Sequence, residues 1–119
     1  MTERFAPLGP DAGRLLLDRL VAEGVRYGRD FGLVRICAPV DVVETLAGQL
    51  DAALRDADVL VRWESDELLA LLPATDGAGT ERAAERMRAA AGSLPAAVGA
   101  AHWLGDTAQD MLARATPQR

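Results

Sequence analysis

Two apolar segments joined by a short acidic turn constrain the fold of this chain more than any other feature. The segments cover residues 59–63 and 68–72, and the turn between them reads Glu64-Ser65-Asp66-Glu67. The first segment alternates in the two-residue period of a strand, which places Val59, Val61 and Trp63 on one face. The second is apolar at every position, and Pro73 directly after it favours a strand over a helix. The sequence therefore predicts a β-hairpin whose second strand is buried on both faces.

The remaining helices and strands are predicted from the spacing of apolar residues and from the turn and capping residues between them. Apolar residues at three- and four-residue steps predict helices, and short runs of strand formers bounded by turn residues predict strands. We expect capping residues at the helix starts, with capping boxes for the second and fourth helices. The predicted helices are 11–28 (stopped by Gly28), 41–55 (Asp41 and Glu44 as capping box), 80–92 (Thr80 as cap, Gly92 as stop) and 106–115 (Asp106 and Gln109 as capping box), and the further strands are 31–37 and 95–103.

The central part of this order is strand, helix, strand, strand, helix, strand. It predicts an α+β fold of the ferredoxin-like (βαββαβ) type, an antiparallel sheet with two helices packed on one face. Residues 1–10, which contain Pro7, Gly9 and Pro10, are expected to form an irregular lead. Residues 11–116 are expected to form one domain, since a chain of 119 residues is of single-domain length.

Composition limits the class of function. The net charge of −5 excludes broad nucleic-acid binding, because no excess of basic residues exists to neutralise phosphates. A single cysteine, Cys37, excludes an internal disulfide and fits a reducing compartment. The N-terminal residues have no signal-peptide core, and no apolar run is long enough to span a bilayer. We therefore expect a soluble cytoplasmic protein that binds neither nucleic acid nor membrane.

The hairpin and its flanks resemble the GGDEF, or diguanylate cyclase, family from about Asp11 to Ala115. The central match is Arg55-Asp-Ala-Asp58, then Arg62-Trp-Glu-Ser-Asp-Glu-Leu68, then Leu71-Leu-Pro73, which is similar to the family's RxxD, R[YW]GG[DE]EF and LLP in register. Shorter pieces agree with the family in the same order: Leu17-Asp-Arg-Leu20, Ala84-Glu-Arg-Met-Arg88 and Val98-Gly-Ala-Ala101. The resemblance implies a bacterial signalling domain with the nucleotide-cyclase type of ferredoxin-like fold.

The departures from the family pattern imply that this domain is degenerate. Active members join two GTP molecules on paired Mg²⁺ ions, and Asp66 and Glu67 match the acidic positions of the signature. The other metal-binding Asp should end the first strand, where Cys37 stands, and a thiol is a poor ligand for a hard cation. Glu64 and Ser65 replace the two glycines that admit the phosphates, and the guanine-reading helix is absent. The resemblance thus predicts a catalytically inactive domain with no metal and no cofactor.

The RxxD element leaves two interpretations open. In the family it forms an inhibitory site for cyclic di-GMP, so Arg55 and Asp58, with Arg86 from the later helix, are the ligand-binding residues that the resemblance implies. Arginine can fork to guanine or phosphate, and aspartate can accept from the amino edge of guanine. The alternative is that Arg55 and Asp58 form an exposed capping pair, worth roughly 0.3–0.5 kcal/mol.

The other polar candidates have structural alternatives too. Asp66 and Glu67 can be ordinary solvated turn formers, and Trp63 is expected to pack beside Val59 and Val61. His102 is expected to be structural, and Cys37 to be a small buried hydrophobe. The alternative function is a protein-interaction or dimerisation module without a nucleotide ligand, whose partner is another protein or a second copy. A weaker third hypothesis is GTP binding without turnover.

Overall fold

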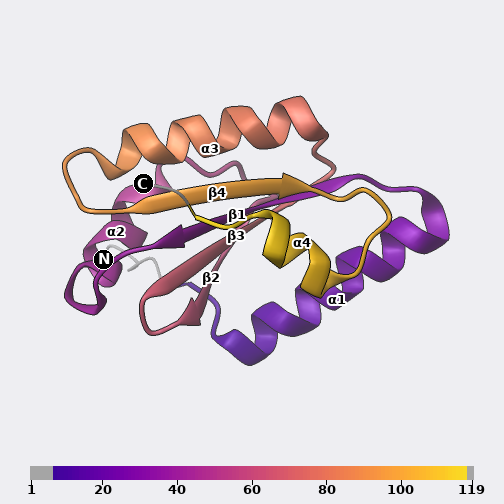
Figure 1. The fold of residues 1–119 in the computed structure, drawn as a ribbon, viewed down its shortest axis with the longest axis horizontal. Helices are drawn as coiled ribbons and strands as arrows, with labels where there is room; N and C mark the ends of the chain where they lie inside the picture. The colour runs from indigo at the N-terminus through magenta and orange to yellow at the C-terminus, as the bar shows by residue number, and fades with distance from the viewer. Residues whose placement is uncertain (1–6, 118–119) are drawn as a thin grey trace.

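The computed structural model of the protein describes residues 7–117. They form one four-stranded antiparallel sheet in the order β2-β3-β1-β4, with helices on both faces (Figure 1). The predicted α+β, ferredoxin-like fold is confirmed. The elements are α1 (Pro10–Tyr27), β1 (Phe31–Cys37), α2 (Val40–Asp51), β2 (Val59–Glu64), β3 (Glu67–Pro73), α3 (Gly77–Ala91), β4 (Ala97–His102) and α4 (Ala108–Arg114).

Two hydrophobic cores lie on the two faces of the sheet. On one face, α2 and α3 pack over residues such as Ile36, Leu68 and Leu72, and on the other, α1 and α4 pack over Leu69 and Leu71 (Figure 1). The second face is therefore covered as well, beyond the two helices on one face that the sequence predicted. Double coverage explains why β3 is apolar at successive positions: Leu68 to Leu72 are all fully buried.

The two predicted glycine stops are right, and the predicted N-caps of three helices are wrong. Gly28 follows α1 with a φ of 67°, and Gly92 follows α3 with a φ of 60°, as expected of glycine stops. However, α2 begins at Val40 after Pro39, without a side-chain cap, so Asp41 lies inside the first turn. The caps of α3 and α4 are Asp76 and Thr107, in place of the predicted Thr80 and Asp106.

Local hydrogen bonds explain these shifts. The carboxylate of Asp76 accepts from Gly79 N at 2.7 Å, so α3 begins at Gly77, and Gly77 and Gly79 belong to its first turn. The hydroxyl of Thr80 points back and donates to Asp76 O at 2.8 Å. In α4 the Thr107 hydroxyl accepts from Asp110 N at 3.1 Å. The cap thus lies four residues before the predicted Thr80 in α3 and one residue after the predicted Asp106 in α4, in each case at a residue whose side-chain oxygen accepts from a backbone N–H of the first turn.

The segment before α1 pairs with the sheet. Leu8 N donates to Leu60 O at 2.9 Å, and Arg62 N donates to Leu8 O at 2.7 Å, which makes a parallel bridge to the outer edge of β2. Residues 1–6 of the predicted lead lie outside the described residues, and Pro10 already belongs to α1. Within residues 7–117, no helix combines the length and the apolar character needed to cross a membrane.

Candidate functional site

The acidic turn joins β2 to β3 at the end of the sheet where β1 also ends. Glu64, Ser65 and Asp66 are exposed, as turn residues usually are. Arg62 reaches forward and donates to the carbonyls of Glu64 at 3.3 Å and Ser65 at 3.1 Å. On the other side, Ala38 N donates to Asp66 O at 3.0 Å. The backbone of the turn is therefore held from both sides, by the side chain of Arg62 and by the residue after β1.

Glu67 is not a solvated turn former. Its side chain is 7% exposed, and its two carboxylate oxygens accept from Arg35 Nε at 2.6 Å and Arg35 Nη2 at 3.1 Å. This is the bidentate geometry in which guanidinium binds carboxylate most strongly. The remaining Nη1 of Arg35 donates to Leu112 O of α4 at 2.8 Å. The hydrogen bond to Glu67 raises the pKa of Arg35 against the opposite effect of burial. The ion pair thus joins β1 to the first residue of β3, with Glu67 buried and Arg35 partly buried.

Cys37 lies beside this pair. The register places Cys37 directly opposite Glu67 across the β1–β3 ladder, so their side chains share a face of the sheet. Burial raises the pKa of the Cys37 thiol, the charge of Glu67 adds to the rise, and Arg35 opposes it. The expectation that Cys37 is a buried hydrophobe is wrong, because β1 ends there and its side chain is partly exposed.

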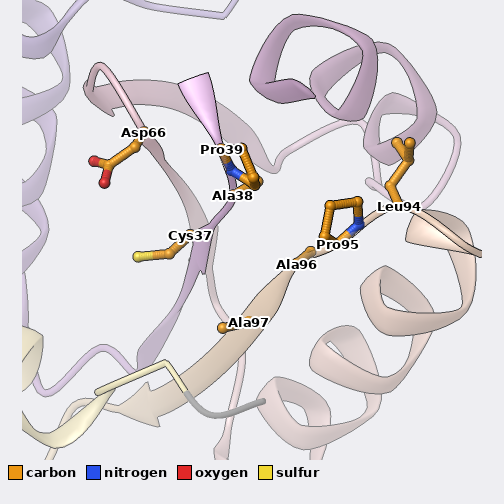
Figure 2. A pocket seen from close by; sticks show the side chains of 8 residues that line it. All are labelled: Cys37, Ala38, Pro39, Asp66, Leu94, Pro95, Ala96 and Ala97. Carbon is orange, nitrogen blue, oxygen red and sulfur yellow. The ribbon is translucent and has the colours of Figure 1, made fainter. Parts of the chain in front are cut away.

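A hollow of about 500 Å³ adjoins Cys37. Its lining is mainly apolar and comes from three places: the end of β1 with Pro39, the turn residue Asp66, and the loop between α3 and β4 with Leu94 and Pro95. In Figure 2 the thiol of Cys37 and the carboxylate of Asp66 point to the same side, away from Leu94 and Pro95. The hollow therefore combines one carboxylate with apolar walls.

The residues at this end of the sheet do not fit the divalent metal that the family resemblance implies. Both oxygens of Glu67 already accept from Arg35, and the raised pKa keeps the Cys37 thiol protonated near neutral pH. A protonated thiol is also the wrong ligand for a cation that selects oxygen. Across residues 7–117 no group of three or more His, Cys, Asp or Glu side chains is arranged to hold a metal ion. Asp66 supplies the carboxylate in the lining of the hollow beside Cys37.

At the other end of β2, the structure brings Arg55 and Asp58 together in a tight turn. Asp58 Oδ2 accepts from Arg55 N at 2.9 Å and from Arg55 Nε at 3.5 Å. The Asp58 side chain is fully buried, whereas that of Arg55 is 55% exposed. Asp58 Oδ1 is buried without a hydrogen-bond partner. The turn also ends α2 early, at Asp51 and not at the predicted Arg55.

Arg86 joins this region indirectly. Its Nε donates to Ala53 O at 3.3 Å, which ties the outer face of α3 to the chain just before the Arg55 turn. Within the described part of the chain, no hydrogen bond connects Arg86 with Arg55 or Asp58. A second hollow of about 500 Å³ is lined by Asp51, Leu54, Arg55, Asp56 and Asp58, together with Leu8, Val59 and Leu60, and Arg86 is not part of its lining.

The two remaining predicted residues have structural surroundings. Trp63 packs with Val59 and Val61 in the core under α1, as the strand alternation predicted. The ring of His102 lies against the start of α3, so close that a Cβ added to Gly77 would come within 2.9 Å of it.

Sequence reasoning missed two side chains that organise these regions, Arg35 and Thr75. Arg35 stands in an apolar strand, and a charged residue in such a place requires a buried partner, so its position was a usable signal. Thr75 accepts from Arg55 Nη2 at 2.6 Å and donates to Pro73 O at 2.9 Å. No local pattern connects Thr75 with a residue that lies 20 positions earlier.

Comparison with known proteins places this geometry in a family. The family described as diguanylate cyclase, GGDEF domain, matches residues 41–112, which is more than half of the chain. The diguanylate cyclase DgcP of Pseudomonas aeruginosa is 37% identical over 86 residues, which cover 71% of this chain and 12% of that protein. This chain therefore corresponds to a small part of that relative.

Solved structures agree in fold. The GGDEF domain of FimX from Pseudomonas aeruginosa superposes with a TM-score of 0.80 at 18% identity, covering 92% of this chain and 84% of that one. The GGDEF domain of DgcB from Caulobacter crescentus, solved in complex with c-di-GMP, gives a TM-score of 0.77 at 14% identity, covering 97% and 88%. With the family match, the predicted resemblance is confirmed: the chain belongs to the GGDEF domain family of diguanylate cyclases.

Proposed function

We propose that this chain is a catalytically inactive GGDEF domain that acts as a cytoplasmic receptor for cyclic di-GMP through Arg55, Asp58 and Arg86. Three features of the signature region support inactivity. Glu67 is paired with Arg35, Glu64 and Ser65 stand where the family has glycines, and only Ala38 and Pro39 separate β1 from α2. The last feature leaves no chain for the guanine-reading helix that the family uses.

The observation that carries the receptor proposal is the arrangement of the Arg55–Asp58 turn. A fully buried carboxylate fixes the backbone and Nε of Arg55 and leaves the outer part of its guanidinium half exposed. An exposed capping pair, the alternative interpretation, would not bury one partner completely. A buried carboxylate oxygen without a donor, such as Asp58 Oδ1, is costly and would gain from an N–H group of a ligand.

The charges around the Arg55–Asp58 turn indicate which part of cyclic di-GMP, base or phosphate, would contact each residue. The hollow beside Asp58 also carries Asp51 and Asp56, so it disfavours phosphate and suits the amino edge of a guanine base. Arg55 also lines this hollow and a neighbouring one, where Arg82 stands with Asp30 and Asp76 and makes the lining more basic than that beside Asp58. Arg86, on the outer face of α3, is exposed. We therefore infer that the base edge faces Asp58 and that the phosphates face the arginines.

Isothermal titration calorimetry with cyclic di-GMP tests the receptor proposal. The wild type should bind, R55A and R86A should bind at least tenfold more weakly, and D58N should lose the base contact. R19A is the matched control, because Arg19 is an exposed arginine on α1, far along the chain from the turn. Absence of heat in the wild type, or affinity in R55A equal to that of R19A, would contradict the proposal.

Incubation with GTP and Mg²⁺, followed by chromatography of the nucleotides, tests inactivity. We expect no cyclic di-GMP above the level of a protein-free control. Cyclic di-GMP that the wild type produces and D66N does not would show that the signature turn retains diguanylate cyclase activity, and would contradict the proposal.

A second candidate is a protein-interaction or dimerisation module, and exposed apolar residues of α1 favour it. Leu15 and Val25 are each 72% exposed and Tyr27 is 58% exposed. Light scattering coupled to size exclusion separates the candidates. A dimer that V25D converts to a monomer, together with no cyclic di-GMP binding, would favour the second.

A further inference from the structure

Arg35 is surrounded by apolar strand positions. In the sheet it lies opposite Leu69 of β3 on one side and Gly99 of β4 on the other, and its side chain is only 22% exposed. A cation in such a place is stable only if negative groups surround it. The structure supplies two, from elements far apart in the sequence.

The first negative group is the carboxylate of Glu67, which accepts two hydrogen bonds from Arg35, of 2.6 and 3.1 Å. The second is the C-terminal end of α4, where Leu112 O accepts from Arg35 Nη1 at 2.8 Å. Carbonyls in the last turn of a helix lack helical partners and carry partial negative charge. A buried carboxylate and a helix C-terminus together make a position that favours a cation of any kind.

We propose that Arg35 is a built-in cation at the signature turn, whose guanidinium occupies the place on Glu67 that a divalent metal ion would need. The positive charge of Arg35 thereby neutralises the carboxylate of Glu67 without a metal ion. The same guanidinium links the turn to α4 through its hydrogen bond to Leu112 O. Removing the positive charge of Arg35 should then open a site for a divalent cation, built from the two oxygens of Glu67 and the carbonyl of Leu112. These are oxygen ligands, which suit Mn²⁺, Mg²⁺ and Ca²⁺.

This proposal goes beyond cyclic di-GMP reception and does not depend on it. It concerns the opposite end of β2 and β3 from Arg55, and its probe is a metal ion without nucleotide. A chain that fails to bind cyclic di-GMP can still have Arg35 in the place of a metal ion on Glu67. A negative result for one proposal therefore leaves the other unaffected.

Thermal unfolding with and without Mn²⁺ tests the proposal on the whole chain. The probe is Mn²⁺ alone, and the variants are R35M, R35K and R35M/E67Q. The wild-type midpoint should not move with added Mn²⁺. R35M, which leaves Glu67 buried and unpaired, should unfold at a lower temperature and regain stability as Mn²⁺ rises, because a ligand that binds only the folded state stabilises it.

The controls separate charge from packing. R35K keeps a positive charge and should not respond to Mn²⁺. R35M/E67Q has no carboxylate and should not respond either. Calorimetric titration should show Mn²⁺ binding to R35M at least tenfold tighter than to the wild type.

Three results would overturn the proposal: a wild-type response to Mn²⁺ as large as that of R35M, no response in R35M, or an equal response in R35M/E67Q. If R35M is unfolded without metal, circular dichroism during a Mn²⁺ titration takes the place of the melting curve. Recovery of the folded spectrum then supports the proposal, and failure to recover counts against it.

Discussion

Cys37 on β1 and Glu67 on β3 lie directly opposite each other at the end of the sheet, so the only thiol of the chain faces a buried carboxylate. Burial, with the charge of Glu67, raises the thiol pKa. Because the thiolate is the reactive species, we expect Cys37 to react with a disulfide reagent more slowly at pH 7 than free cysteine does. The rate should increase as the pH rises above about 8.5, the ordinary thiol pKa.

The variant E67Q tests the electrostatic part of this prediction. It removes the negative charge and leaves Arg35 nearby, so the pH at which Cys37 becomes reactive should fall. The measurement is the absorbance of the released chromophore across a pH series, with folding checked by circular dichroism. An unchanged profile in E67Q would mean that burial alone controls the thiol.

The Asp58 carboxylate should contribute more to the free energy of unfolding than the side chain of an exposed turn residue does. D58A removes the acceptor of Arg55 N–H, and we expect a loss of about 1 kcal/mol in the free energy of unfolding. D58N should lose less, because the amide oxygen still accepts that hydrogen bond and a buried charge disappears. Urea denaturation measures both. D56A, an exposed neighbour, is the control and should change the free energy by less than about 0.5 kcal/mol.

Gly32 of β1 should not tolerate a side chain. A methyl group at this position would overlap the hydroxyl of Thr80, which is 99% buried at the start of α3. We expect G32A to lose about 1–3 kcal/mol, the usual cost of overpacking a core. The loss should be smaller when T80A is already present, since the colliding atoms are then gone. A double-mutant cycle in urea measures the coupling, and simple additivity would contradict the steric explanation.

Asp106 should make the stability of the domain fall in acid. Burial opposes ionisation of Asp106, but hydrogen bonds from Arg114 and from Leu104 N outweigh it and lower its pKa. A carboxyl group whose folded pKa is depressed contributes stability above its unfolded pKa of about 3.9, and this contribution is lost as the pH falls through the folded value.

Unfolding curves of the wild type and D106N check this sign. The wild type should be the more stable protein above about pH 5, and the difference should shrink below about pH 4. A difference that stays constant across this range would show that Asp106 acts through packing and not through its charge.

The sequence predicted the sheet well because its strands carry their own signal. Residues 31–37 form β1 as predicted, and the run of Leu around Ala70 marks a strand covered on both faces. Helix starts were less predictable. An Asp or Thr can serve as cap or lie in the first turn, and the choice between Asp76 and Thr80 depends on how the preceding loop leaves the sheet.

The candidate site was predictable only where its residues are near in sequence. Arg55 and Asp58 are three positions apart and meet as expected, whereas Arg86 reaches only the backbone of Ala53. The pairing of Arg35 with Glu67 spans 32 positions and depends on the β1–β3 register, which the order of elements alone does not give. For the same reason the sequence left Glu67 open as a signature carboxylate or a solvated turn former, and did not show that it is the buried partner of Arg35.

The parallel bridge between Leu8 and β2 matters for anyone who shortens this chain. The residue range predicted for the domain starts at 11, and a chain cut there would lack both backbone hydrogen bonds to the outer edge of β2. A bare strand edge is a template on which other molecules can add strands. Such a shortened protein should therefore be more prone to aggregation than one that keeps Leu8, even though its core residues are all present.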